Sequence, residues 1–221
     1  MFIIYNRCVI ISGSPVCCNI ELSKSDYIIA CDKGYQHAQN FNITPNIILG
    51  DFDSYDGDFD SNIEIITAPC HKDDTDTLLG VKYGLSKGFD NFLLLGATKG
   101  RLDHQMANFS TCAFIASQGA SCQMIDNENY IYAIKDSKLV LDKKENWSVS
   151  VFSFTDTSIG VTLKGLKYTL DNATLTNLFP TGVSNEFEDD IASIEVKSGI
   201  LLVIVSSLDK EKSKTKEVSK S

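Results

Sequence analysis

Short apolar runs alternate with longer amphipathic segments over roughly the first 125 residues of the chain. The runs are rich in Ile, Val and Leu and are bounded by Gly, Pro or charged residues, as buried strands are. Strands are predicted at 8–12, 27–31, 46–49, 63–68, 91–95 and 122–125. Strands that alternate with helices favour an open, largely parallel α/β sheet of the Rossmann-like kind.

Three helices are predicted between these strands, from about 34 to 41, from 73 to 85 and from 102 to 117. In the last of them the apolar residues recur with spacings of 4, 3, 4 and 3, as on one face of a helix. These residues are Leu102, Met106, Phe109, Ala113 and Ala116. The apolar residues on one side of the middle helix are Leu78, Val81 and Leu85. Each pattern predicts a helix with one apolar face.

The pattern changes near Asn127, after which short β-like runs follow one another with turn residues between them. The runs are 130–134, 138–141, 148–154, 160–163, 191–196 and 200–206. No helix is predicted among them, so this half is expected to form a small antiparallel sandwich or barrel. We therefore predict an α/β domain at 1–135, a β domain at 136–208 and, from its Lys-, Ser- and Glu-rich composition, a disordered tail at 209–221.

Charge and cysteine usage exclude several classes of protein. A net charge of −9 argues against a general binder of nucleic acid or of anionic membranes. The N-terminus lacks the pattern of a signal peptide and no apolar run approaches 18 residues. The seven cysteines include no C-x-x-C pair, which indicates neither a disulfide framework nor a zinc site. A reducing cytoplasm is the compartment that we expect.

Acidic residues are concentrated between Asp51 and Asp76, where nine acids accompany one basic residue, Lys72. Asp51 and Asp53 are two positions apart, so in an extended segment they project to the same side. Oxygen ligands of this kind suit Mg²⁺, which takes one or two protein carboxylates and leaves its other positions to water and phosphates. An acidic surface loop or a calcium loop is the alternative, although the EF-hand spacing fits badly.

The second part of this acidic region, 72–76, lies at the start of the predicted middle helix. Asp73 and Asp76 are three positions apart and would share one helical face. Acids at a helix start also have an ordinary explanation, because they cap free N–H groups and complement the helix dipole. Beside the first acidic motif we favour a functional role, with Lys72 meeting a phosphate.

The segment 96–104, Gly-Ala-Thr-Lys-Gly-Arg-Leu-Asp-His, opens the last predicted helix. Small residues at a helix N-terminus let the backbone approach a phosphate, and Arg101 adds a fork of donors. The segment is not a Walker loop. His104 and Asn108 are four positions apart and share a face, while capping by Asp103 and an exposed His104 are the plainer interpretation.

Four motifs thus fall at predicted strand ends: 32–34, 50–54, 72–76 and 96–104. Ligands bind at the carboxyl ends of the strands in open α/β sheets, so this convergence predicts one magnesium-nucleotide site. In the second half, 165–168 and 182–186 read as turns by composition alone.

Taken in order, these motifs resemble those of the thiamine pyrophosphokinases. The matching elements are Asp32-Lys33-Gly34, Gly50-Asp51-Phe52-Asp53-Ser54, Lys72-Asp73-Asp74-Thr75-Asp76, the segment from Gly96 to Asn108, Gly165-Leu166-Lys167-Tyr168 and Ser184-Asn185. The resemblance implies an α/β nucleotide-binding domain followed by a β-sandwich. It also implies the conversion of ATP and thiamine to AMP and thiamine diphosphate with Mg²⁺, in a homodimer that holds thiamine between one subunit's α/β domain and the other's sandwich.

The same resemblance implies roles for individual residues of this chain. The metal and the triphosphate would be organised by Asp51, Asp53, Asp73 and Asp76. Phosphate and nucleotide contacts would come from Asp32, Gly34, Ser54, Lys72, Thr75, Arg101 and His104. Thiamine would be seated by Tyr168, Ser184 and Asn185. Either Asp76 or Asp103 would orient or deprotonate the thiamine hydroxyl.

Two other functions stay open on the residues alone. One is a different magnesium enzyme on a similar scaffold, such as a phosphohydrolase or a pyrophosphokinase for another alcohol. The other is a sensor that binds thiamine or a nucleotide without catalysis, which would not need four placed carboxylates.

Overall fold

A computed structural model describes residues 5–16, 22–52, 57–67 and 74–208 of the chain. The chain divides into two compact units, Met1–Asn127 and Glu128–Ser221, and each is described by itself. The tail predicted to be disordered, 209–221, lies outside the described residues. No helix in the described part is long and apolar enough to cross a membrane.

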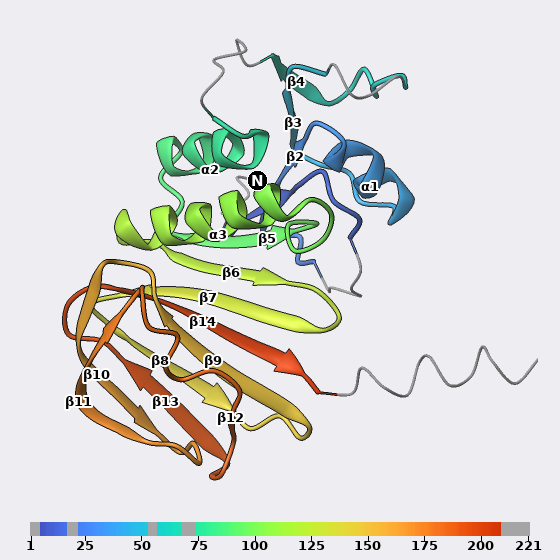
Figure 1. Cartoon of the computed structure of the whole chain (residues 1–221). Helices are drawn as coiled ribbons and strands as arrows, with labels where there is room; N and C mark the ends of the chain where they lie inside the picture. The colour runs from blue at the N-terminus through green and yellow to red at the C-terminus, as the bar shows by residue number, and fades with distance from the viewer. Residues whose placement is uncertain (1–4, 17–21, 53–56, 68–73, 209–221) are drawn as a thin grey trace, which may run out of the picture. The chain divides into compact units, whose positions relative to one another are not determined.

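Unit 1 is built on parallel strands, as the alternation of strands and helices predicted (Figure 1). The strands are β1 (Arg7–Ile11), β2 (Asp26–Cys31), β3 (Ile47–Gly50), β4 (Glu64–Thr67), β5 (Asn91–Leu95) and β6 (Ser121–Ile125). Their order within the unit is β6-β5-β1-β2-β3-β4, and each neighbouring pair is parallel. The order reverses between β1 and β5, which is where open α/β sheets bind ligands.

Three helices cover this sheet: α1 (Gly34–Asn40), α2 (Asp76–Ser86) and α3 (Leu102–Ser117). Ala38 of α1 packs with Val9 and Ile11 on one face of β1. On the opposite face, Gly80 of α2 lies against Ile10. Helices α2 and α3 lie side by side (Figure 1). The sheet is therefore covered on both faces, as parallel sheets with apolar strands require.

The predicted middle helix begins three residues later than expected. Thr75 is extended and its Oγ1 accepts the N–H of Leu78 at 3.3 Å, so α2 begins at Asp76 rather than at residue 73. The expectation that Asp73 and Asp76 share a helical face involves a position before the threonine cap and stays a prediction. Asp73 lies outside the described residues.

The buried side of α2 also differs from its apolar pattern. Its buried residues are Thr77, Gly80, Val81 and Gly84, whereas Leu78 and Leu85 are half-buried. A Cβ at Gly80 would come within 2.6 Å of Cys31 Sγ, so this helix packs its backbone close to the sheet. The close approach makes small residues, rather than leucines, the buried face.

Helix α3 has the predicted bounds, but its first two turns do not bury the predicted apolar face. Leu102 is 77% exposed and Met106 is 57% exposed. Asn108 and Thr111 are buried instead, together with Cys112. The periodicity identified the helix but not which side of its first turns faces inward.

Unit 2 contains antiparallel strands in two sheets. The strands are β7 (Asn129–Lys135), β8 (Lys138–Asp142), β9 (Trp147–Ser153), β10 (Thr157–Lys164), β11 (Leu170–Thr176), β12 (Asn185–Glu186), β13 (Ile191–Glu195) and β14 (Ile200–Ser207). Within the unit, one sheet has the order β12-β9-β14-β7 and the other β11-β10-β13-β8. Val151 and Val203 of the first sheet share one core with Leu163 and Ile194 of the second, which confirms the sandwich.

Two strands of this unit were not predicted. β11 pairs with β10 although its residues, Leu-Asp-Asn-Ala-Thr-Leu-Thr, are half polar. Only Leu175 among them is buried, so the strand lacks the alternation that marks a half-buried strand in a sequence. β12 is two residues long and pairs with β9 at a position where composition indicated a turn.

The described cysteines are buried free thiols: Cys8, Cys31, Cys112 and Cys122. Burial raises the pKa of Cys8 to about 12 and raises the pKa of Cys122 well above its ordinary value. Since the thiolate is the reactive form, we expect native protein at pH 8 to resist iodoacetamide at Cys8, Cys31 and Cys122 and unfolded protein to react. Peptide mass spectrometry measures this, and equal modification of Cys8 before and after unfolding would contradict it.

Candidate active site

A cavity of about 400 Å³ opens in unit 1 at the carboxyl ends of β1, β2 and β5. Its walls are Ser12, Gly13, Ser14, Cys31, Asp32, Lys33, Thr75, Asp76, Thr77, Gly96, Arg101, His104 and Asn108. The cavity therefore lies where the strand order reverses, the position at which a sheet of this kind binds a ligand.

The start of α2 supplies one wall. Thr75 caps the helix, and Asp76 is its first residue and the acid of its first turn. Thr77 is buried, and its Oγ1 donates to Ser12 Oγ at 2.9 Å. Asp76 therefore lies in the first turn of α2, and a helix start also favours an anionic ligand.

The turn before α3 supplies a second wall. Gly96 has φ +61° and Gly100 has φ +91°, conformations that side chains rarely adopt. Asn108 is buried and its Nδ2 donates to the carbonyl of Ala97 at 2.7 Å, which fixes the turn on the helix. His104 and Asn108 both line the cavity, so their predicted shared face is confirmed.

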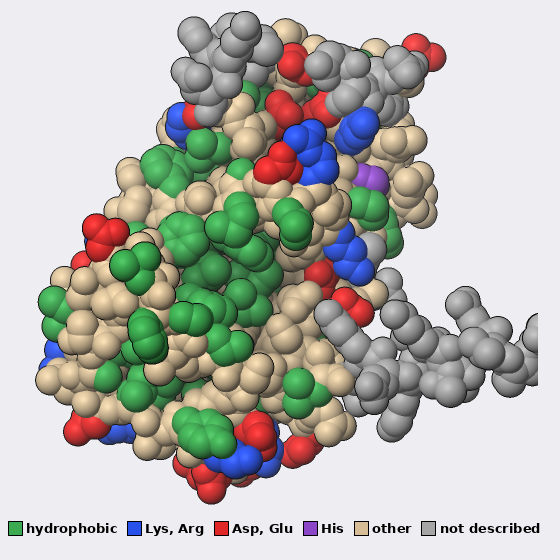
Figure 2. Space-filling view, viewed as in Figure 1, with side chains coloured by type: hydrophobic (Ala, Val, Ile, Leu, Met, Phe, Trp, Pro, Cys, Tyr) green, Lys and Arg blue, Asp and Glu red, His purple; other side chains and the backbone are tan. Residues whose placement is uncertain are grey.

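Arg101 and Asp103 are paired with each other. Arg101 Nε donates to Asp103 Oδ1 at 3.1 Å and its Nη2 donates to Oδ2 at 2.5 Å. Both side chains are exposed. Other acidic and basic side chains also lie on the surface of unit 1, in the upper part of Figure 2. The hydrogen bonds and charge of the guanidinium lower the pKa of Asp103, and those of the carboxylate raise the pKa of Arg101. Arg101 lines the cavity and Asp103 does not.

The end of β2 contributes one negatively and one positively charged side chain to the cavity, Asp32 and Lys33. Asp32 has φ +46° and is followed by exposed Lys33. Burial, and after it the negative charges that include Asp76 and Asp32, raise the pKa of the Cys31 thiol well above its ordinary value. Both carboxylates therefore lie close enough to the Cys31 thiol, which also lines the cavity, to affect its pKa. Gly34 has a packing role, since a Cβ there would lie 2.0 Å from the carbonyl oxygen of Ile11.

The end of β3 differs from the expectation. Asp51 is exposed and is not among the cavity walls. The next residue, Phe52, has φ +61°. Because Asp53 lies outside the described residues, its alignment with Asp51 stays a prediction. The ring of Phe52 packs edge-on against that of Phe59, with the ring centroids 4.9 Å apart. Asp53, Ser54 and Lys72 lie outside the described residues, as Asp73 does.

Sequence reasoning missed several residues of the cavity. Ser12, Gly13 and Ser14 follow β1 and were interpreted only as the end of a strand, while Lys33 and Thr77 had no assigned role. A Gly between two serines after a buried strand was an available signal, since such loops line ligand sites in parallel sheets. Thr77 had no such signal, because a buried threonine on a helix reads as packing.

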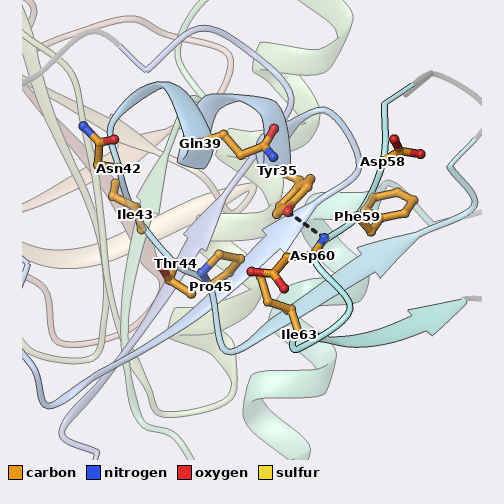
Figure 3. Close-up of a pocket in the computed structure, with 10 residues that line it drawn as sticks. All are labelled: Tyr35, Gln39, Asn42, Ile43, Thr44, Pro45, Asp58, Phe59, Asp60 and Ile63. Carbon is orange, nitrogen blue, oxygen red and sulfur yellow. Dashed lines mark hydrogen bonds between the residues drawn. The ribbon is translucent and has the colours of Figure 1, made fainter.

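A second hollow of about 510 Å³ lies elsewhere in unit 1 (Figure 3). Tyr35 and Gln39 of α1 face residues 58–60 across it, and the Tyr35 hydroxyl accepts the N–H of Asp60 at 3.1 Å. Residues 42–45 line it and precede β3, so it lies away from the carboxyl ends of the strands. Although it is larger than the first cavity, its place in the sheet makes it the poorer candidate.

In unit 2 the predicted substrate residues take different roles. Asn185 is only 2% exposed, and its side chain accepts the N–H of Tyr168 at 3.0 Å and donates to the Tyr168 carbonyl at 2.7 Å. Tyr168 is 64% exposed, and Ser184 has φ +57°. Asn185 thus holds the backbone that presents the ring of Tyr168. The nearby ion pair with Glu186, at 3.1 Å, raises the pKa of Lys167.

Comparison with known proteins agrees with this geometry in both units. The model of the thiamin pyrophosphokinase catalytic domain matches residues 18–124, and that of the thiamin pyrophosphokinase vitamin B1 binding domain matches residues 136–201. The thiamine pyrophosphokinase of Bacillus subtilis is 29% identical over 182 residues, which cover 80% of this chain and 85% of the relative. Thiamin pyrophosphokinase 1 of Caenorhabditis elegans is 24% identical over 213 residues, with coverage of 89% and 86%.

Solved structures give the same result. The crystal structure of thiamine pyrophosphokinase from Bacillus subtilis has a TM-score of 0.81 at 25% identity and covers 91% of this chain and 99% of its own. Thiamin pyrophosphokinase from Candida albicans has a TM-score of 0.70 at 15% identity, covers 92% and 90%, and supports the fold alone. With both domain models matched in order and the cavity at the switch point of the sheet, the chain belongs to the thiamine pyrophosphokinase family.

Proposed function

We propose that this protein transfers the diphosphate of ATP to the hydroxyl of thiamine, giving thiamine diphosphate and AMP. One observation supports it above the others: Asp76 and Arg101, which are 25 positions apart, line the same cavity at the carboxyl ends of the strands. A carboxylate side and a cationic side facing one cavity suit a phosphate chain that reaches the enzyme with a cation.

In the proposed reaction the oxygen of the thiamine hydroxyl forms a bond to the β-phosphorus of ATP. The bond from the β-phosphorus to the oxygen that bridges to the α-phosphate breaks, and the electron pair leaves with AMP. The hydroxyl proton passes to a carboxylate or to water. Arg101 and Lys33 would meet the phosphate oxygens, and the protein would act mainly by positioning and by neutralising charge.

The residues present fit a magnesium ion carried by the nucleotide. No group of three His, Cys, Asp or Glu side chains within the described ranges could hold a metal ion by itself. Mg²⁺ needs only one or two protein carboxylates when phosphates and water complete its shell. Asp76 and Asp32 line the cavity and would supply them, with Asp51, Asp53 and Asp73 as further proposed ligands. Bound there, Mg²⁺ would neutralise phosphate charge.

The pairing of Arg101 with Asp103 helps to choose between the two proposed acceptors of the proton. A carboxylate with a lowered pKa is a weaker base, and Asp103 is such a carboxylate. We therefore favour Asp76 for orienting the hydroxyl, and Asp103 for holding Arg101.

Arg101→Ala should raise the KM for ATP by about tenfold or more, because a charge-assisted contact to phosphate is lost. Asp103→Asn should change kcat by less than about tenfold, since general-base catalysis contributes about 100-fold or more where it operates. Steady-state kinetics of both variants measures this. A loss of 100-fold or more in kcat on Asp103→Asn, with the KM for ATP unchanged, would make Asp103 the base.

Thiamine is proposed to bind through the second unit. The exposed ring of Tyr168 would pack on the substrate, with Ser184 close by and Asn185 holding the backbone of Tyr168. From the family resemblance we also propose a homodimer in which two subunits together complete the thiamine site. Sedimentation analysis of the purified protein tests the assembly.

The reaction is tested by incubation with ATP, Mg²⁺ and thiamine, with the products separated by chromatography. We expect AMP and thiamine diphosphate in equal amounts and no reaction when thiamine is omitted. Inorganic phosphate alone would indicate a phosphohydrolase. Tight thiamine binding by calorimetry without AMP would indicate a sensor.

A further inference from the structure

The loop that follows β1, Ser12 to Ser14, contacts both walls of the cavity. Ser12 bonds to the first turn of α2, and Ser14 bonds to the turn that precedes α3. The first bond joins two residues that are 65 positions apart in the sequence, and the second joins two that are 85 positions apart. The charged groups of the proposed site, Asp76 and Arg101, are the immediate neighbours of the segments so held.

The contact of Ser12 is a buried pair of hydroxyls. Thr77 Oγ1 donates to Ser12 Oγ at 2.9 Å, and the two residues are 7% and 2% exposed. A hydrogen bond between desolvated groups is expensive to leave unmade, so this contact resists displacement. Thr77 is the second residue of α2 and directly follows Asp76. The backbone of Asp76 is therefore held at a set position relative to the end of β1.

The contact of Ser14 holds the glycine turn. Its Oγ donates to the carbonyl of Lys99 at 2.6 Å, and its N–H donates to the carbonyl of Gly96 at 3.0 Å. A Cβ at Gly96 would lie 2.3 Å from the Ser14 carbonyl oxygen, so the two backbones are in direct contact. Arg101 lies two residues beyond Lys99, at the N-cap position of α3. The place of Arg101 thus depends on a turn that Ser14 ties to the sheet.

We propose that Ser14 and the Ser12–Thr77 pair are positioning residues that set the separation between Arg101 and Asp76 across the cavity. The inference rests on the proposed function, since it takes the cavity as the site of ATP. The Ser14 contact acts on the nucleotide through Arg101, and the Thr77 contact acts on the requirement for Mg²⁺ through Asp76. Neither hydroxyl needs to touch the reacting atoms.

The first experiment measures the Kd of ATP by calorimetry with Mg²⁺ and without thiamine, so that inactive variants can be compared. Ser14→Ala should weaken ATP binding about fivefold, the effect of losing one neutral hydrogen bond that orders a binding group. The same substitution in an Arg101→Ala background should change the Kd less than twofold, because the effects of substitutions at residues that act through one another are not additive. Ser14→Thr keeps the hydroxyl and should restore binding.

Ser117→Ala is the matched control. Ser117 Oγ also donates to a backbone carbonyl at 2.6 Å, that of Phe114, but at the far end of α3. It should leave the Kd of ATP unchanged. A Ser14→Ala variant with wild-type Kd, or one whose effect persists in full without Arg101, would overturn the role of Ser14.

The second experiment titrates Mg²⁺ at a fixed ATP concentration and follows ATP binding. Thr77→Val, which keeps the shape and removes the hydroxyl, should raise the half-saturating Mg²⁺ concentration about fivefold. Thr77→Ser should return it to the wild-type value, and Ser12→Ala should reproduce the effect of Thr77→Val. Variants that change only the melting temperature would make the pair purely structural and overturn the inference.

Failure of the proposed function gives a different result. If the wild-type protein binds ATP with Mg²⁺ but yields no thiamine diphosphate, the proposed reaction is contradicted. The positioning roles are then still tested by the Kd values of the variants. Wild-type protein that binds no ATP would overturn both.

Discussion

Asp76→Asn should lower kcat by about 100-fold or more while the protein stays folded. Asp76 is the first residue of α2 and lines the cavity, as Arg101 does. The substitution keeps the shape of the side chain and removes the charge that would hold the metal and orient the hydroxyl. Its helix-start position predicts a loss of only about 0.3–1 kcal/mol in the free energy of unfolding. Product assays and urea denaturation measure the two effects separately.

Asp74→Asn is the matched control for this variant. Asp74 is two positions away and pairs with Lys82 at 2.6 Å, outside the walls of the cavity. An exposed pair of this kind contributes about 1 kcal/mol or less to the free energy of unfolding. Because Asp74 does not line the cavity, kcat should stay within about twofold of wild type. Equal losses in both variants would mean that the general negative charge of the segment matters, and would contradict a specific role for Asp76.

Gly96→Ala should lower the free energy of unfolding by about 2–4 kcal/mol and reduce activity in the fraction that folds. The residue has φ +61°, and an added Cβ would lie 2.3 Å from the carbonyl oxygen of Ser14. Backbone atoms cannot move aside as a flexible side chain can, so the turn that leads to Arg101 would have to shift. Urea denaturation gives the stability, and the KM for ATP reports the shift.

Gly88→Ala is the matched control, because it measures the stability cost of a side chain at positive φ without a steric contact. Gly88 has φ +89°, but no atom lies within 4 Å of the place where its Cβ would be. It should lose only about 1 kcal/mol, the penalty for a side chain in this conformation, with unchanged kinetics. Equal stability losses in the two variants would show that the contact with Ser14 is relieved at little cost.

Most strands and all three helices of unit 1 could be predicted because their signals are local. The run 91–95 and the helix 102–117 were predicted with the bounds that the structure has. The start of α2 was placed three residues early because acids and a threonine cap both indicate a helix start, and only the geometry of Thr75 separates them. β11 was missed because few of its residues are buried, so its place depends on pairing with β10.

The charged residues of the candidate site could be predicted from the sequence, whereas its hydroxyl residues could not. Asp32, Asp76 and Arg101 stand out because several charged residues follow strand ends, where a parallel sheet gathers them. Ser12 and Thr77 carry no comparable signal, since a buried hydroxyl finds its partner through long-range packing. Asp103 was predicted as a catalytic residue, yet its pairing with Arg101 became evident only from side-chain geometry.

The sequence by itself determined the order of elements in the α/β half, the change to a β half, and the family through its motifs. These properties follow from periodicity and from residue types at short spacing, which neighbouring residues settle. Only the tertiary structure decided that α2 buries glycines, that α3 exposes Leu102 and Met106, and that Ser12 and Ser14 join the two walls of the cavity. Each of those depends on close packing between segments far apart in the chain, where a contact is set by the fold and not by the residues beside it.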